Sequence, residues 1–119
     1  MIFSSRRLVK QEDLNPNSHL FGGRLLEWID EEASIFAICQ FAPDAKITTA
    51  HMSSIDFTGS AKLGDILEIG TSLVKIGRTS ITISCVVRNV QTKTQIVKVE
   101  NIVVVNLDEN GTPTPHNLQ

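Results

Sequence analysis

The chain has 119 residues, of which 41% are hydrophobic and 20% are charged, and its formal net charge at pH 7 is -2. This length predicts a single domain over residues 1–119, and the composition is that of a folded globular protein. No apolar run approaches the roughly 18 residues of a membrane-spanning helix, so we expect no membrane association. The weakly acidic charge argues against nucleic-acid binding, because a duplex-binding surface needs many basic side chains to neutralise phosphates.

The N-terminus and the cysteines bear on where the protein resides. Arg6 and Arg7 form an arginine pair, but polar residues follow it instead of the apolar stretch of a twin-arginine export signal. Cys39 and Cys85 are far apart in sequence and lack the spacing of a zinc site or of a disulfide framework. We therefore expect a cytoplasmic protein in which both thiols are inert packing groups.

The first half of the chain predicts one long helix. Residues 4–9 are compatible with an edge strand, and residues 20–41 place apolar side chains at the three-to-four spacing of an amphipathic helix. Gly22 and Gly23 lie at the start of this helix, and Pro43 follows its end.

The second half predicts an antiparallel meander. The four expected strands are residues 46–57, 65–76, 79–89 and 95–107. Gly77 and Arg78 form a two-residue loop of the kind that closes a hairpin. Residues 111–119, which contain two prolines, are expected to be a flexible tail.

These elements predict an α+β fold in which one helix covers an antiparallel sheet of about five strands. Ile81, Ile83 and Cys85 alternate with Thr82 and Ser84, so we expect one face of the sheet to be buried and the other to be partly polar. A domain of this size buries a limited share of its surface, and its sheet has open edges. We therefore expect a dimer or a larger assembly.

The polar loop before the helix, together with the Gly22-Gly23 pair, forms the first candidate site. Asn15, Asn17 and Ser18 belong to the residue types that build turns and cap helices, so a capping loop is the simplest interpretation. The alternative starts from the glycines, because uncovered N–H groups at a helix start can bind an oxyanion or a polarised carbonyl oxygen. The pattern by itself does not choose between the two.

Asp30 is the second candidate. It lies seven residues, or two helical turns, after Gly23 and is expected on the same side of the helix. A partly desolvated carboxylate at this position could act as a general base or as a nucleophile. The alternative is that Asp30, Glu31 and Glu32 form one solvated acidic turn.

Other catalytic and metal-binding signatures are absent from the sequence. His19, His51 and His116 are dispersed and give no metal-ligand spacing, so we predict no metal site. There is no G-x-S-x-G elbow, no phosphate-binding P-loop and no dinucleotide fingerprint. Three basic residues lie around the first hairpin and the loop before it, and they are either ordinary surface residues or a local phosphate clamp: Lys62, Lys75 and Arg78.

Several motifs taken together resemble the acyl-CoA hydrolase family of hotdog-fold thioesterases. The likeness lies in Asn15-Pro16-Asn17, Phe21-Gly22-Gly23-Arg24-Leu25-Leu26, Trp28-Ile29-Asp30-Glu31, Ser54-Ile55-Asp56-Phe57, Gly64-Asp65 and Lys75-Ile76-Gly77-Arg78-Thr79-Ser80. It extends over residues 7–108, nearly the whole chain. The resemblance implies a hotdog fold, in which an antiparallel sheet wraps a long central helix, with homodimers as the working unit and often a trimer of dimers.

The resemblance also implies the site residues. Asn15 and Asp30 would be the catalytic pair, facing each other across the dimer. Gly22 and Gly23 would place a backbone amide at the thioester oxygen. The residues that would contact coenzyme A are Gly77, Arg78, Thr79 and Ser80, with Arg78 suited to a phosphate.

Two positions depart from the pattern of the family. The family usually has Gly where this chain has Ser18, and it commonly has Pro in the stretch after Phe57, where this chain reads Thr58-Gly59-Ser60-Ala61. We expect these departures to alter loop shape and acyl preference without removing the catalytic pair.

The residues and the resemblance together predict hydrolysis of acyl-CoA to free coenzyme A and a carboxylic acid, without a metal or a redox cofactor. Asp30 would activate a water or attack the thioester, and Asn15 would orient the water or polarise the carbonyl. The alternative is a hotdog protein that binds acyl-CoA or an acyl carrier without hydrolysing it, as a sensor or an assembly subunit. A hydro-lyase on the same fold would want a histidine beside Asp30, and the sequence has none there.

Overall fold

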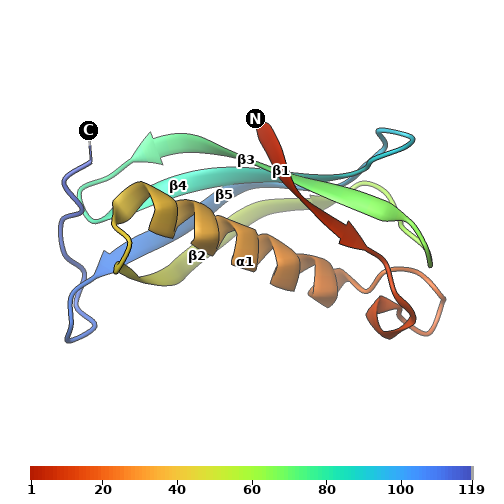
Figure 1. Ribbon diagram of the computed structural model, residues 1–119, viewed down its shortest axis with the longest axis horizontal. Helices are drawn as coiled ribbons and strands as arrows, with labels where there is room; N and C mark the ends of the chain where they lie inside the picture. The colour runs from red at the N-terminus through yellow and green to blue at the C-terminus, as the bar shows by residue number, and fades with distance from the viewer. Residues whose placement is uncertain (119) are drawn as a thin grey trace.

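Five strands form one antiparallel sheet, and a long helix lies across one of its faces (Figure 1). The computed structural model describes residues 1–118. The elements in chain order are β1 (Ile2–Leu8), the short 3-10 helix η1 (Gln11–Asp13), α1 (Gly22–Phe41), β2 (Lys46–Phe57), β3 (Ile66–Ile76), β4 (Ser80–Asn89) and β5 (Gln95–Leu107). The strands lie in the order β1-β3-β4-β5-β2, and all neighbours are antiparallel. The predicted α+β fold, a long helix wrapped by a five-stranded antiparallel sheet, is confirmed.

The turn between β3 and β4 differs from its prediction by one residue. Gly77 N donates to the Ser80 carbonyl at 2.8 Å, which extends the strand ladder past Ile76. The central residues of the turn are therefore Arg78 and Thr79, and the predicted Gly77-Arg78 loop is wrong by one position.

The helix packs on the sheet through one apolar stripe. Leu25, Ile29, Ala33 and Ala37 follow the three-to-four spacing of α1 and are at most 3% exposed. The inner face of β4 supplies the fully buried side chains Ile81, Ile83, Cys85 and Val87. Burying one large apolar side chain contributes about 2 kcal/mol, so this contact holds the helix in place. No helix among the described residues has the length and the apolar character that a membrane span requires.

The edge strand β2 is long and uncovered. It has 12 residues, it pairs only with β5, and none of its residues is buried. An open strand edge of this kind offers unpaired N–H and C=O groups to another chain. The expected association into a dimer or a larger assembly therefore has a surface that could support it.

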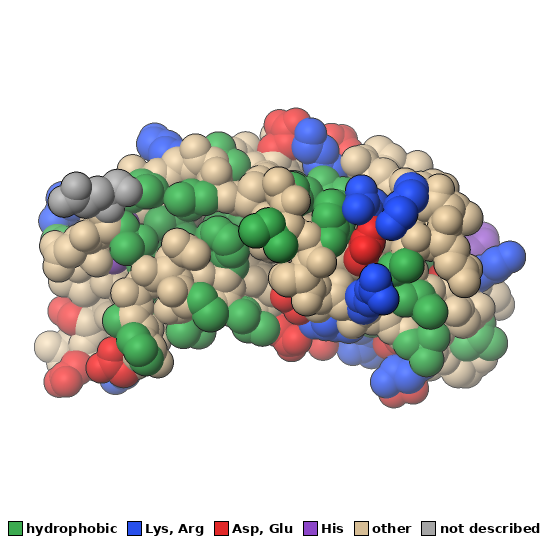
Figure 2. Space-filling model, turned by 45° about the horizontal axis from the view of Figure 1, so that its top comes forward, with side chains coloured by type: hydrophobic (Ala, Val, Ile, Leu, Met, Phe, Trp, Pro, Cys, Tyr) green, Lys and Arg blue, Asp and Glu red, His purple; other side chains and the backbone are tan. Residues whose placement is uncertain are grey.

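Large apolar side chains are also exposed elsewhere on the molecule, including on β1 at the opposite edge of the sheet. On the face seen in Figure 2, hydrophobic side chains form a band along the middle, and most of the basic side chains lie toward one end. The large hydrophobic residues that are more than half exposed are Met1, Ile2, Leu8, Phe21, Phe57, Leu63 and Val74.

The segment that follows β5 runs back along one end of the molecule, past the β3–β4 hairpin and the end of α1 (Figure 1). His116 in this segment stacks on Phe41 with ring centroids 5.0 Å apart, and its backbone N–H group donates to the Arg78 carbonyl. The sequence predicts a flexible tail over residues 111–119. The described part of this tail makes contacts with the helix and the hairpin, and Gln119 lies outside the described residues.

The two cysteines lie in contrasting surroundings. Cys85 is fully buried on β4, and burial raises the pKa of its thiol to about 12, with the negative charge of Glu32 adding to the effect. Cys39 is exposed in the last turn of α1. Because the thiolate is the reactive form of cysteine, the Cys85 side chain acts as an inert packing group at neutral pH.

We expect a thiol reagent at pH 8 to label one cysteine of the folded protein quickly and both cysteines only after unfolding. A thiol with the pKa of Cys85 is ionised at pH 8 to on the order of one part in 10,000, and it is also shielded from the reagent. Mass spectrometry of wild type, Cys39→Ser and Cys85→Ser would count the labelled thiols. Fast labelling of the folded Cys39→Ser protein would contradict the burial of Cys85.

Candidate active site

Asp30 projects from the middle of α1 toward β2, where Thr49 meets it. The Thr49 hydroxyl donates to Asp30 Oδ1 at 2.6 Å, and both residues are half-buried. Among the described residues, no hydrogen bond engages Asp30 Oδ2. One carboxylate oxygen is therefore held in place, and the other is available to a water or a substrate.

Thr49 is a candidate residue that the sequence pattern did not single out. It pairs with the buried Val104, so its side chain lies on the helix-facing side of β2, between those of Ile47 and Met52. A polar side chain on the apolar side of a strand needs a hydrogen-bond partner. The signal in the sequence was a threonine at a position where the alternation of the strand predicts an apolar side chain. The identity of its hydrogen-bond partner depends on how the helix lies across the strand.

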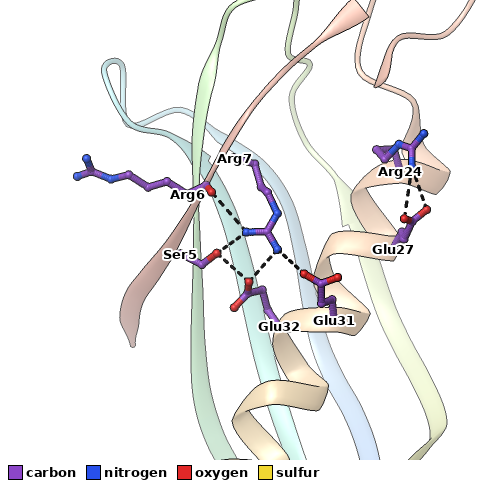
Figure 3. A network of polar contacts seen from close by, with 7 residues as sticks. All are labelled: Ser5, Arg6, Arg7, Arg24, Glu27, Glu31 and Glu32. Atoms are coloured by element: carbon purple, nitrogen blue, oxygen red, sulfur yellow. Dashed lines mark hydrogen bonds and ion pairs between the residues drawn. The ribbon is translucent and has the colours of Figure 1, made fainter. Parts of the chain in front are cut away.

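The same helical turn is held from the opposite edge of the sheet (Figure 3). Arg7 Nη2 on β1 lies 2.9 Å from a carboxylate oxygen of Glu31 and 2.9 Å from one of Glu32. Ser5 Oγ donates to the same Glu32 oxygen at 2.7 Å. The alternative of one solvated acidic turn is therefore wrong, because Asp30 faces β2 whereas Glu32 faces β1 and is largely buried.

The start of α1 presents two uncovered amides. Among the described residues, no hydrogen bond engages the N–H groups of Gly22 and Gly23, and the preceding Phe21 provides no side-chain cap. A Cβ on Gly23 would lie 2.7 Å from the Phe21 ring, and one on Gly22 would lie 3.5 Å from the Phe57 ring. Gly23 therefore has no room for a Cβ unless the Phe21 ring moves, whereas a Cβ on Gly22 would make an ordinary contact. Both N–H groups lie at the positive end of the helix dipole, which can stabilise an oxyanion.

Asn15 shapes the loop before α1. Its Oδ1 accepts hydrogen bonds from the N–H groups of Asn17 at 2.9 Å and His19 at 3.1 Å, so the side chain does support a turn. Asn15 Nδ2 makes no hydrogen bond among the described residues and remains available as a donor. Ser18 has a φ of +62°, in the left-handed region that favours glycine. This backbone angle explains why a glycine is typical there, and serine bears a cost of about 1 kcal/mol.

The hairpin at residues 77–80 lies at the other end of the molecule from the loop before α1 (Figure 1). Among the described residues, the N–H groups of Arg78 and Thr79 have no hydrogen-bond partner. The Arg78 side chain is exposed, and no ion pair of the described residues includes it. Free amides beside a guanidinium group can bind a phosphate.

One chain does not bring the predicted site residues together. The site residues form three separate groups, which are Asn15 with Gly22 and Gly23, Asp30 with Thr49, and the 77–80 hairpin. The helical rise alone separates Gly23 from Asp30 by about 10 Å. No hydrogen bond of the described residues joins Asn15 to Asp30. The residues predicted to act together therefore lie apart within one chain.

The histidines lie apart from one another, in the loop before α1, in β2 and in the C-terminal segment. The described residues contain no group of three or more His, Cys, Asp or Glu side chains that could hold a metal ion.

Comparison with known sequences places the chain in a family. The family model described as Thioesterase superfamily matches residues 17–96, more than half of the chain. A protein of Buchnera aphidicola subsp. Acyrthosiphon pisum named as an uncharacterized acyl-CoA thioester hydrolase is 32% identical over 79 residues, which are 66% of this chain and 57% of that protein. A Zymomonas mobilis protein with the same kind of name is 32% identical over 78 residues, 66% of this chain and 51% of that protein. The chain spans about half the length of the curated relatives it matches.

Solved structures share the fold. An apo hexameric acyl-CoA thioesterase has a TM-score of 0.84 and 34% identity, with 93% of this chain and 72% of that chain covered. The acyl-CoA hydrolase of Staphylococcus aureus, solved with butyryl coenzyme A, coenzyme A and coenzyme A disulfide, has a TM-score of 0.82 and 30% identity, with 93% and 66% covered. A hexameric thioesterase of Yersinia pestis, at 24% identity and a TM-score of 0.88 over 96% and 93% of the two chains, supports the fold alone.

The residues matched by the family model include the helix start, Asp30, Thr49 and the 77–80 hairpin, whereas Asn15 lies just before them. The sequence match and the fold match therefore cover most of the candidate site. The chain belongs to the thioesterase superfamily.

Proposed function

We propose that this protein hydrolyses an acyl-CoA thioester to free coenzyme A and a carboxylic acid, with Asp30 as general base or nucleophile. The observation that carries the proposal is the Asp30 carboxylate, which Thr49 holds through one oxygen while the other is open. A fixed carboxylate is suited to taking a proton from water or to attacking a carbonyl carbon. Relatives named acyl-CoA hydrolases or thioesterases, at 30% identity or more, support the same activity.

The Staphylococcus aureus hydrolase adds support for the individual residues. Its structures include alanine variants of one asparagine and one aspartate, which are separated by the same number of positions as Asn15 and Asp30. A further alanine variant replaces a threonine 17 positions after that aspartate, whereas Thr49 follows Asp30 by 19 positions, so the case for Thr49 depends on its own hydrogen bond to Asp30. We infer that Asn15 and Asp30 act together, and that Thr49 supports Asp30 through the hydrogen bond between them.

The reaction is proposed to need two chains. Antiparallel pairing of two β2 edges would place the Phe57 end of one strand beside the Lys46 end of the other. Gly22 lies against Phe57 in its own chain, so the helix start of one subunit would approach Thr49 and Asp30 of the other. A homodimer with two shared sites is the minimum assembly. The hexameric state named for a relative supports a trimer of dimers.

Each group in such a shared site has its own task. The Gly22 and Gly23 amides of one subunit donate to the thioester oxygen and stabilise the negative charge that develops on it. Asn15 of that subunit orients the water or polarises the carbonyl through Nδ2. Asp30 of the other subunit takes a proton from the attacking water, or it attacks the carbonyl carbon and forms an anhydride that water then cleaves. In both routes the C–S bond breaks and coenzyme A leaves as its thiolate, which takes up the proton held by Asp30 in the first route and a proton from solvent in the second. No metal or redox cofactor takes part.

We expect Asp30→Asn to lower kcat by about 100- to 10,000-fold, because that is the usual contribution of a positioned proton acceptor. The measurement is thiol release from a panel of short- to long-chain acyl-CoAs. Glu27→Gln is the matched control, since Glu27 lies on the same helix, is exposed and, among the described residues, forms an ion pair with Arg24 alone. Near-wild-type turnover of the Asp30→Asn protein would refute the role of this carboxylate. Wild-type protein that binds coenzyme A but releases no thiol would instead favour a non-hydrolytic binding protein.

We expect Thr49→Val to lower kcat by about 10- to 100-fold, the effect of losing one hydrogen bond to a charged group. Valine keeps the shape of the side chain but leaves Asp30 Oδ1 without its donor. Thr48→Val is the control, because Thr48 is the preceding residue, is exposed and points to the opposite face of the strand. Steady-state kinetics of the two variants side by side would decide, and equal effects would argue against a specific role of Thr49.

Shared sites predict that two inactive variants restore activity when they are mixed. Asn15→Ala and Asp30→Asn subunits, dissociated together and reassembled at equal amounts, should recover about a quarter of the wild-type activity, since half of the dimers are mixed and each mixed dimer has one intact site. Each variant taken alone through the same procedure is the control. A mixture that stays as inactive as its components would indicate that each chain builds its own site.

A further inference from the structure

The C-terminal segment contacts the backbone of the 77–80 hairpin, which is the predicted binding site of coenzyme A. A role of this segment in substrate binding therefore rests on the proposed function. Asn106 N donates to the Thr79 carbonyl at 2.7 Å, and His116 N donates to the Arg78 carbonyl at 3.4 Å. His116 Nε2 lies 3.0 Å from the Ser80 carbonyl oxygen. Three successive carbonyl groups of the hairpin are therefore occupied by residues that lie far along the chain.

The His116 ring is fixed by three different segments. Leu118 N donates to His116 Nδ1 at 3.0 Å, so Nδ1 is an acceptor and Nε2 carries the proton that is donated to the Ser80 carbonyl. The face of the ring stacks on Phe41 at the end of α1, with centroids 5.0 Å apart and planes at 12°. A neutral imidazole in one tautomer thus joins the helix end, the hairpin and the C-terminal segment.

The hairpin keeps its free donors for a ligand. The N–H groups of Arg78 and Thr79 have no partner among the described residues, and the Arg78 guanidinium is exposed. A cavity next to His116 is lined by the charged side chains Asp44, Lys46, Asp108 and Glu109. Its three carboxylates disfavour an anion there. The amides and the guanidinium of the hairpin are therefore the groups that suit a phosphate.

We propose that His116 is a positioning residue for coenzyme A. By anchoring the hairpin carbonyls, it holds the free amides and Arg78 in place for a phosphate group of the coenzyme. The hairpin lies apart from Asp30, which faces Thr49 in the middle of the helix. We expect this contact to stabilise the ground state and the transition state equally, and the loss of such uniform binding raises KM and leaves kcat unchanged.

The test compares three variants of the full chain at position 116. His116→Ala removes the stack and both ring hydrogen bonds, His116→Phe keeps the stack on Phe41 alone, and His116→Gln keeps an N–H group that can reach the Ser80 carbonyl. Thr112→Ala is the matched control, because Thr112 is exposed in the same segment and its N–H group, not its side chain, makes the contact with Asp108. The measurements are kcat and KM with one acyl-CoA, and the Kd of coenzyme A by calorimetry.

We expect His116→Ala and His116→Phe to raise KM and Kd by about 5- to 10-fold, the effect of losing one or two hydrogen bonds, with kcat within about twofold of wild type. His116→Gln should recover most of the affinity, and Thr112→Ala should match wild type. Circular dichroism identifies any variant that fails to fold, and the test then depends on His116→Phe, which retains the packing of the ring.

An unchanged Kd in folded His116→Phe would overturn the role, and so would a fall in kcat with KM unchanged. Wild-type protein that neither binds coenzyme A nor releases thiol is a different result. It would overturn the proposed function, and the role of His116 with it.

Discussion

The packing of the apolar stripe of α1 on the inner face of the sheet decides where every candidate group lies. With that stripe buried, the helical period directs Asp30 toward β2 and Glu32 toward β1. Thr49 and Arg7 then hold these two carboxylates from the opposite edges of the sheet. A rotation of the helix about its axis would break both sets of contacts. The core therefore stabilises the fold and also sets the direction of the carboxylate to which we assign the chemistry.

The same architecture separates the helix start from that carboxylate. Two turns of helix lie between Gly23 and Asp30, and a side chain cannot shorten that distance along the axis. The open edge of β2 offers a physical solution, because antiparallel pairing with a second copy reverses the direction of the second helix. On the proposed function, assembly and activity would be coupled, since the surface that covers the strand edge would also complete the site.

Backbone amides without an intrachain partner occur at both ends of the described part of the molecule. Gly22 and Gly23 expose theirs at the helix start, and Arg78 and Thr79 expose theirs at the β3–β4 turn. At the turn, the carbonyl groups accept hydrogen bonds from residues of β5 and the C-terminal segment, and the N–H groups of Arg78 and Thr79 remain available to a ligand. In an antiparallel dimer, the helix start of one subunit approaches the hairpin end of the other. The thioester oxygen and a phosphate of the same substrate would then be bound by backbone groups of different subunits.

Apolar periodicity in the sequence predicted the helix and the strands to within two residues at each end, because it depends directly on which face of each element is buried. Residue type also made Asp30 and the two glycines candidates, since a carboxylate and uncovered helix amides have evident chemical uses. The contacts of Thr49 with Asp30 and of His116 with the hairpin could be found from the three-dimensional structure alone. These partners lie 19 and 36 positions apart in the chain, and their contacts depend on strand register and on the path of the C-terminal segment. A local sequence pattern cannot predict contacts between residues so far apart in the chain, because these contacts arise from the packing of separate segments.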